Sequence, residues 1–299
     1  MTITDGGALP EGSTIRGLRT KAEYTVERLL GEGSKGQVYL VGGSDSRRYA
    51  LKLARDSRSL AAEIQCLKKL SPRIQRSRPF FVAADECMID RRLRPFYVMA
   101  FVQGESMFEA ARAERGHSFY MTGYYLLRKL DVLHRRGYAF GDLKPSNVLV
   151  GADGAVSLID YGGVTVFGQP IRQCTELYDR ASWQCGARIA DAGYDLFAFA
   201  LVHMQLADAL PDDPGLPQMR SGAQLVRALQ SSRLDVETAR VLARMINGEY
   251  RSAAAALNDW RELLRRRQTN EWPGASPRFI WTLAAAGCML AVLIYIVTG

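Results

Sequence analysis

Four polar residues near the middle of the chain have the types and the spacing that phosphoryl transfer needs. Asp142, Lys144 and Asn147 lie in one short stretch, and Asp160 follows after two apolar runs. One carboxylate can accept the proton of an attacking hydroxyl, and the lysine can offset charge on the transferring group. The asparagine and the second carboxylate can bind magnesium that bridges nucleotide phosphates. We therefore predict that Asp142 and Lys144 are catalytic and that Asn147 and Asp160 are metal ligands.

A glycine-rich stretch near the N-terminus supplies candidates for nucleotide binding. Gly31, Gly33 and Gly36 lie between two strand-like apolar runs, and Val38 begins the second run. This context favours a flap over phosphates, because a Rossmann turn would lead into a helix instead. We predict that these four residues bind the nucleotide.

Lys52 lies inside a further apolar run, where a charged side chain is costly unless it has partners. The expected partners are the nucleotide phosphates and a carboxylate on the next helix. Glu63 is the best candidate for that carboxylate, although only eleven positions separate it from Lys52. The alternative is that Glu63 is an ordinary surface residue.

The elements that must position these groups follow from hydrophobic periodicity. Strand patterns cover residues 38–41, 49–53, 96–102, 148–150 and 156–159. Helical patterns cover residues 59–70, 119–134, 194–206, 224–230, 236–246 and 253–267. A strand-rich first third followed by a helix-rich remainder predicts an α+β fold with two lobes and a cleft between them.

The stretches 141–147 and 158–162 together resemble the catalytic loop and the metal-binding loop of the protein kinase family. The resemblance covers roughly residues 24–267 and implies the two-lobed protein kinase fold, a β-rich N-lobe before a helical C-lobe, with ATP and Mg2+ as cofactors and protein substrates. It implies that Glu105 reaches the ribose, with a solvated loop carboxylate as the alternative. Asp195 matches an aspartate that opens a buried helix and holds the catalytic-loop backbone, which is a structural role.

The resemblance also implies how the chain is divided. We expect a flexible segment at 1–22, an N-lobe at 23–103, a C-lobe at 104–267, a juxtamembrane linker at 268–278 and a transmembrane helix at 279–297.

Three stretches are similar to a narrower group within the family. Residues 138–145, 178–183 and 194–198 resemble YabT-like tail-anchored kinases of spore-forming Firmicutes, a subgroup of the bacterial Hanks-type (eukaryotic-like) serine/threonine kinases. This resemblance implies transfer of the ATP γ-phosphate to protein serine or threonine hydroxyls and a link to sporulation. The sequence chemistry itself says nothing about sporulation.

Several positions depart from the family pattern. Phe140 and Gly141 precede Asp142 where the family usually has histidine and arginine, so activation by a phosphate on the following loop is in doubt. Ala-Ser-Trp at 181–183 replaces Ala-Pro-Glu, and we expect the usual ion pair to a late arginine, here Arg251, to be absent.

Two other functions stay open. A catalytically weak pseudokinase scaffold would bind nucleotide without transferring phosphate, but Lys52, Asp142, Asn147 and Asp160 are all present, which favours an active enzyme. A small-molecule kinase is the second alternative, but Lys144, two positions after Asp142, favours protein substrates.

The C-terminal end carries a different signal. Residues 279–297 form an uninterrupted apolar run without a charge. A helix of this length spans about 28 Å, close to the hydrocarbon thickness of a bilayer. Arg265, Arg266, Arg267 and Arg278 precede it, so the positive-inside rule places the kinase domain in the cytoplasm. We expect a single-pass, tail-anchored protein of the cell membrane, with a buried core helix as the alternative.

Composition limits the partners. The net charge of +8 favours acidic partners such as nucleotides, nucleic acid or anionic lipid. Residues 265–267 are the candidates for contact with anionic lipid, and non-specific DNA is the alternative. Five cysteines without C-x-x-C spacing and three histidines argue for reduced thiols and against a zinc site.

Overall fold

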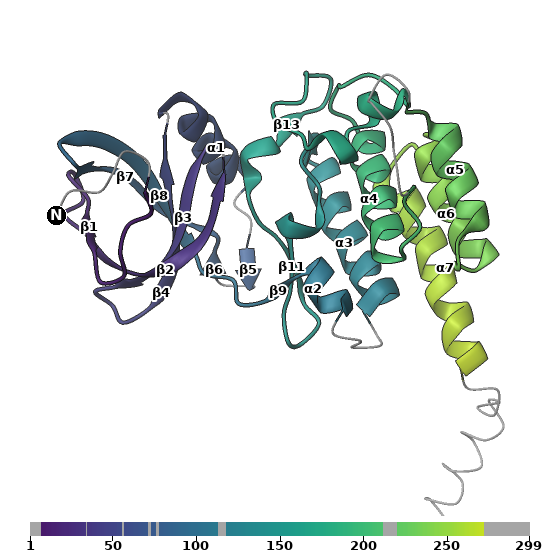
Figure 1. The fold of residues 1–299 in the computed structure, drawn as a ribbon, viewed down its shortest axis with the longest axis horizontal. Coiled ribbons are helices and arrows are strands. Elements are labelled where there is room, and N and C mark those ends of the chain that lie inside the picture. Colours follow the sequence, from purple (N-terminus) through teal and green to yellow (C-terminus); the bar gives the residue numbers. More distant parts are fainter. Residues whose placement is uncertain are drawn as a thin grey trace, which may run out of the picture.

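Two lobes follow one another along the chain (Figure 1). The computed structural model describes residues 7–33, 35–55, 57–70, 73–75, 78–112, 118–211 and 220–271. The first lobe consists mainly of antiparallel strands with one long helix, and the second consists mainly of helices. The predicted α+β architecture, a strand-rich lobe before a helical lobe, is confirmed.

Six strands form the main sheet of the first lobe, in the order β1-β2-β3-β4-β8-β7. Their bounds are β1 Thr14–Arg16, β2 Glu23–Gly33, β3 Gly36–Gly43, β4 Arg48–Ala54, β7 Phe81–Ile89 and β8 Arg92–Ala100. Two short strands, β5 Arg73–Gln75 and β6 Arg78–Pro79, pair with each other.

The two faces of this sheet bury different groups, as the alternation of a strand requires. Leu51 and Leu53 of β4 belong to one apolar cluster, whereas Ala50 and Ala54 belong to the cluster that includes α1 (Ser57–Leu70). Lys52 alternates with Leu51 and Leu53 and shares the face of Ala50 and Ala54, so it lies on the same side as α1. This alternation brings the lysine to the helix that was expected to carry its partner.

The expectation that residues 1–22 are a flexible segment is wrong for part of the segment. Residues 14–16 form β1, which pairs with β2, and Ile15 is buried. The turn after β1 is held by the buried carboxylate of Asp85 on β7, which accepts hydrogen bonds from the Thr20 backbone N–H and hydroxyl, both at 2.7 Å. The sequence did not predict β1 because three residues are too few to show the alternation of a strand. The residue that holds the following turn, Asp85, also lies far along the chain.

The helical lobe is built around α4, whose residues are buried on nearly every side. The helices are α2 Met107–Arg112, α3 Ser118–His134, α4 Ala192–Leu206, α5 Gly222–Ser231, α6 Val236–Ile246 and α7 Ala253–Glu271. Helix α7 packs along α3, where the indole N–H of buried Trp260 donates to the backbone oxygen of Tyr120 at 2.8 Å. The predicted helices are present, and α2 is an addition to them.

Short strands frame the predicted catalytic region. β11 (Val148–Val150) pairs with both β12 (Val156–Leu158) and β9 (Glu105–Ser106), and β10 (Tyr138–Ala139) pairs with β13 (Thr165–Val166). The two strands predicted at 148–150 and 156–159 are therefore confirmed.

The predicted transmembrane helix at 279–297 and most of the linker at 268–278 lie outside the described residues. Within the described ranges, none of the helices combines the length and the apolar character needed to cross a bilayer.

His203 on α4 makes the stability of the helical lobe depend on pH. The ring is fully buried, stacks on Phe199 at a centroid distance of 3.9 Å, and also contacts Phe119 and Trp260. Burial lowers its pKa from 6.5 to about 4. Below pH 6.5 the unfolded chain binds a proton that the folded chain does not, so stability is lost as the pH falls.

We expect the free energy of unfolding to fall by roughly 3 kcal/mol between pH 7 and pH 4 through this one group. Urea denaturation followed by tryptophan fluorescence, at several pH values in this range, measures the decline. In His203→Gln, which cannot titrate, the decline should be smaller by about that amount. An equal decline in both proteins would contradict the assignment to His203.

Candidate active site

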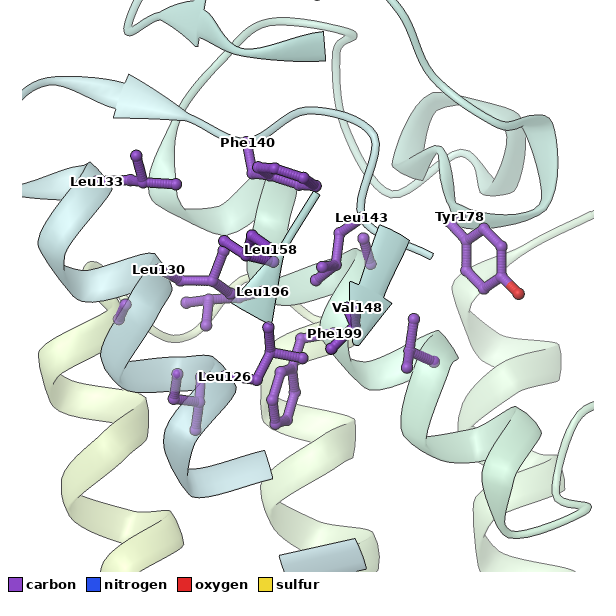
Figure 2. Close-up of a cluster of buried hydrophobic side chains, with 14 of the residues drawn as sticks. Leu126, Leu130, Leu133, Phe140, Leu143, Val148, Leu158, Tyr178, Leu196 and Phe199 are labelled. Carbon is purple, nitrogen blue, oxygen red and sulfur yellow. The ribbon is translucent and has the colours of Figure 1, made fainter. Parts of the chain in front are cut away.

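Apolar residues anchor the stretch that carries Asp142. Phe140, Leu143 and Val148 are fully buried. Figure 2 shows them in the core of the helical lobe, beside Leu130 of α3 and Leu196 of α4. The chain alternates between these apolar residues and the polar ones, so packing of the first group fixes the second. The polar groups of 142–147 are thus held by a rigid support.

A buried carboxylate fixes the backbone of the same stretch. Asp195, which is fully buried, accepts hydrogen bonds from the backbone N–H of Phe140 at 2.7 Å and of Gly141 at 2.9 Å. His134 Nε2 lies 2.8 Å from the same carboxylate. The predicted structural role of Asp195 agrees with this geometry. One detail differs, because the residue that caps α4 is Asp191, and Asp195 lies in the first turn.

Gly141 has a structural reason to be glycine. Its φ is +82°, a conformation that side chains with a Cβ rarely adopt. A Cβ at this position would lie 2.4 Å from the backbone oxygen of Gly163. The position before Asp142 is therefore shaped by backbone contact with the loop that follows Asp160.

A pair of alanine variants separates these two effects. Gly154 has a similar φ of +76° but no atom within 4 Å of a Cβ. We expect Gly154→Ala to lower the free energy of unfolding by about 1 kcal/mol and Gly141→Ala by roughly 3 kcal/mol, with phosphoryl transfer lowered only in the second. Chemical denaturation and a transfer assay measure both. Equal effects on stability would mean that the contact with Gly163 is unimportant.

The carboxylate of Asp142 is almost completely buried and is held by four side chains. Thr175 donates its hydroxyl to Oδ1 at 2.8 Å, and Gln173 Nε2 donates to Oδ2 at 3.0 Å. Lys144 Nζ lies 3.2 Å from Oδ2 and also donates to the Thr175 hydroxyl at 3.1 Å. Asn147 Nδ2 lies 3.4 Å from Oδ2 and donates to the Asp142 backbone oxygen at 2.8 Å. The structure thus brings Asp142, Lys144 and Asn147 together.

Two members of this cluster were not predicted as site residues. They are Thr175 and Gln173, and neither was predicted to contact Asp142. Both lie more than thirty positions after Asp142, in an irregular segment without periodicity. The Gln173 amide donates to Oδ2 of Asp142, the oxygen that Lys144 and Asn147 also approach.

A second cluster joins the two lobes through charge. Lys52 Nζ lies 3.0 and 2.9 Å from the two oxygens of Glu63 on α1 and 2.9 Å from Asp160 Oδ1. Lys52 and Glu63 are buried, and the Asp160 side chain is 34% exposed. The alternative that Glu63 is a surface residue is wrong. Short spacing along the chain does not prevent the pair, because only two residues separate the end of β4 from the start of α1.

The charges of this cluster stabilise one another. Burial works to lower the pKa of Lys52, but the charges of Glu63 and Asp160 raise it above its ordinary value. For Asp160, burial works to raise the pKa, while the Lys52 charge and hydrogen bonds lower it below its ordinary value. Burial dominates for Glu63, whose pKa is raised despite Lys52. The site therefore holds an ammonium and the Asp160 carboxylate in their charged forms.

Aromatic packing links the two clusters. Tyr161, next to Asp160, is buried against Phe80 of the first lobe at a centroid distance of 5.4 Å. On its other side it contacts Phe140 of the second lobe at 5.8 Å. Asp160 itself has a φ of +57°, and its carboxylate accepts a hydrogen bond from the Gly162 N–H. This stack sets the position of Asp160 relative to the loop of Asp142.

The glycine-rich stretch forms the hairpin of β2 and β3. Gly31 and Gly33 are exposed and have open space around them, as a flap needs, whereas residue 34 lies outside the described part. Gly36 is glycine for another reason, since a Cβ there would lie 2.2 Å from the Leu53 backbone oxygen. Val38 is half-buried opposite Lys52.

Glu105 lies outside this hairpin. It is exposed on β9, opposite Val150, and its predicted contact with a ribose stays a prediction.

The donor groups suit nucleotide and magnesium. Asn147 uses its amide nitrogen within the protein, which leaves its carbonyl oxygen for a metal, and Asp160 supplies a carboxylate. Mg2+ is commonly bound by one or two such oxygens together with substrate phosphates. Among the residues that the structure describes there is no cluster of three histidine, cysteine or acidic side chains, so a metal cage made only of those side chains is not seen there.

A different carboxylate organises the segment where Ala-Pro-Glu was expected. Asp179 is fully buried and accepts hydrogen bonds from Arg188 Nε and Ser182, both at 2.9 Å, and from the Tyr194 hydroxyl at 2.8 Å. Burial works to raise its pKa, but these donors lower it below its ordinary value. The segment after Thr175 is therefore held by Asp179.

The basic residues at 265–267 already have acidic neighbours. Arg265 and Arg266 each approach Glu262 to 2.9 Å on the exposed side of α7. Arg267 pairs with Asp235 at the start of α6 and lies over the Tyr120 ring at 4.0 Å. Their contact with lipid or DNA stays a prediction.

Comparisons with known proteins place this geometry in context. The family model described as "Protein kinase domain" matches residues 24–206. The serine/threonine-protein kinase YabT of Bacillus subtilis is 31% identical over 91% of this chain and 80% of its own length. A putative ribosomal protein S6 kinase alpha-2 of Caenorhabditis elegans is 31% identical over 60% of this chain but only 23% of its own length. The solved structure of vaccinia related kinase 3 superposes with a TM-score of 0.59 at 15% identity, over 88% of this chain and 94% of that one.

Proposed function

Because the chain belongs to the protein kinase family, we propose that its two charged clusters form the active site of a bacterial, YabT-like serine/threonine kinase. ATP with Mg2+ supplies the phosphoryl group. Asp142 accepts the proton of a serine or threonine hydroxyl, and Lys144 offsets charge that develops in the transition state. Lys52 binds nucleotide phosphates, and Asn147 and Asp160 hold the metal.

One observation carries this assignment. The Thr175 hydroxyl lies between the Asp142 carboxylate and the Lys144 ammonium, at 2.8 and 3.1 Å. An aliphatic hydroxyl therefore fits these two groups in the geometry expected of a hydrogen-bonded acceptor. The buried support of the loop keeps that geometry fixed.

A transfer assay tests the proposal against the two alternatives. The full-length protein is incubated with labelled ATP and magnesium, with a generic protein substrate, beside Asp142→Asn and Lys52→Ala. Label on the kinase or on the substrate, lost in both variants, is expected. Thermal stabilisation by ATP without any transfer would indicate a pseudokinase scaffold. ATP consumption without protein labelling would point to a small-molecule acceptor.

We also propose that the kinase is anchored in the cell membrane with its catalytic domain in the cytoplasm. The support is the apolar run at 279–297 and the arginines before it. The full-length protein should pellet with membranes after a carbonate wash, and a variant that lacks 279–297 should not. Recovery of both in the soluble fraction would contradict the anchor.

Arg265 and Arg266 are exposed, so we propose that they contact anionic lipid beside this anchor. Alanine at 265–267 should weaken binding to anionic vesicles. Salt-sensitive DNA retention that is lost in the same variant would favour DNA instead.

A role in sporulation rests only on the resemblance to kinases of spore-forming bacteria, and a spore-formation defect after deletion of the gene would support it.

A further inference from the structure

A tyrosine outside the predicted site contacts the central ion pair. Tyr97 lies on β8, directly opposite Lys52 on β4, and its side chain is fully buried. Its hydroxyl donates to Glu63 Oε1 at 2.8 Å, the same oxygen that lies 3.0 Å from Lys52 Nζ. The Glu63 carboxylate is thus held from the sheet by two neighbouring strands at once.

The carboxylate needs such support because burial opposes its charge. Glu63 is only 4% exposed, and burial raises its pKa, while Lys52 and the Tyr97 hydrogen bond lower it. Three groups face it: Lys52 from β4, Tyr97 from β8, and Asp160 from the loop after β12. Of these, Asp160 repels the carboxylate, so Lys52 and Tyr97 carry the stabilisation.

The tyrosine also fixes distance. A phenol has few rotatable bonds, and this ring is enclosed on all sides, so its hydroxyl cannot follow a moving helix. If α1 moved away from the sheet, the buried hydroxyl would lose its acceptor on Glu63, and a buried donor without an acceptor costs more than an ordinary hydrogen bond contributes. Movement of α1 away from the sheet would therefore leave both the Tyr97 hydroxyl and the Glu63 carboxylate without this hydrogen bond.

We propose that Tyr97 is a positioning residue that locks Glu63 of α1 onto Lys52, so that the ion pair needed for phosphoryl transfer is built into the sheet. In protein kinases this pair is what helix position and loop phosphorylation control. Here glycine precedes Asp142, and the lock supplies the helix position without a phosphate on the following loop. The inference rests on the proposed kinase function.

Tyr97→Phe removes one oxygen and leaves the ring in place. Tyr39→Phe is the matched control, because Tyr39 is equally buried in the first lobe and donates its hydroxyl to Gln37 at 2.8 Å, in the other apolar cluster. With the full-length protein we expect kcat/KM for ATP to fall about tenfold in Tyr97→Phe and to change by less than about twofold in Tyr39→Phe.

Measurements in two backgrounds separate positioning from a general loss of stability. In a Glu63→Gln background, Tyr97→Phe should lower kcat/KM by less than about twofold, since the group it acts through is gone. In the wild-type background the same substitution should lower kcat/KM about tenfold, so the comparison of the two backgrounds isolates the contribution made through Glu63.

Wild-type kinetics in Tyr97→Phe, or an undiminished effect in the Glu63→Gln background, would overturn the proposal. Hydrogen exchange of residues 57–70 tests the lock without any need for activity. Their amides should exchange faster in Tyr97→Phe than in Tyr39→Phe, and equal rates would also overturn it. If the wild-type protein transferred no phosphate but showed this difference, the kinase function would fail while the lock remained.

Discussion

Replacing Asp142 by asparagine is expected to lower the rate of phosphoryl transfer by about 10³-fold, with nucleotide binding retained. Asparagine keeps the shape of the side chain and one acceptor oxygen, but it cannot take a proton from a substrate hydroxyl. The groups proposed to bind the nucleotide are others, above all Lys52 with its partners Glu63 and Asp160. Labelled transfer measures the first effect, and thermal stabilisation by ATP with magnesium measures the second.

Asp153→Asn is the control for this change. Asp153 is an exposed aspartate in the turn between β11 and β12, and it accepts a backbone hydrogen bond from Ala155 at 3.0 Å. The same chemical substitution there should leave transfer within about twofold. If Asp142→Asn retained most of the activity, the carboxylate would not be the proton acceptor, and the assignment of roles around Thr175 would have to be abandoned.

The groups that the sequence could predict share one property, which is that their neighbours along the chain identify them. Lys52 is conspicuous as a charge inside an apolar strand, and Asp142 and Asn147 alternate with Leu143 and Val148. Asp160 follows the end of β12 after one intervening residue. A local apolar pattern that is interrupted by a polar residue carries this information, so those positions could be read without any knowledge of tertiary contacts.

The groups that escaped prediction depend on contacts between distant segments. Tyr97 and Glu63 are 34 positions apart, and Gln173 and Asp142 are 31 apart. A tyrosine in an apolar strand looks like an ordinary core residue, and a glutamine in an irregular loop looks solvated. Only the pairing of β4 with β8 and the path of the segment after β13 bring them to the site.

Dependence on distant contacts also explains why part of the fold was not predicted from the sequence. β7 was not predicted, because its polarity is inverted at two positions: Asp85 is buried and Met88 is 55% exposed. The buried aspartate is there to hold the turn around Thr20, a partner that the sequence of β7 does not reveal. The helices around α4 were predicted well because their apolar faces repeat over several turns, which is a longer and more redundant signal.

Replacing Asp195 by asparagine is expected to affect both stability and catalysis. The amide offers one acceptor oxygen where the carboxylate now serves the N–H groups of Phe140 and Gly141, at 2.7 and 2.9 Å, and the His134 ring. At least one buried donor loses its acceptor, so we expect the free energy of unfolding to fall by roughly 3 kcal/mol. The released backbone is the segment that carries Asp142, so transfer should fall as well.

Asp208→Asn is the control, since Asp208 is exposed near the other end of α4 and should change stability by less than about 0.5 kcal/mol. Denaturation and transfer are measured on the same samples, well below the melting temperature. Asp142→Asn should lose transfer while the protein stays folded, whereas Asp195→Asn should lose stability and transfer together, because one carboxylate reacts and the other holds the loop. Full activity in a destabilised Asp195→Asn would show that the loop keeps its shape without this anchor, and that Phe140, Leu143 and Val148 are sufficient to position Asp142.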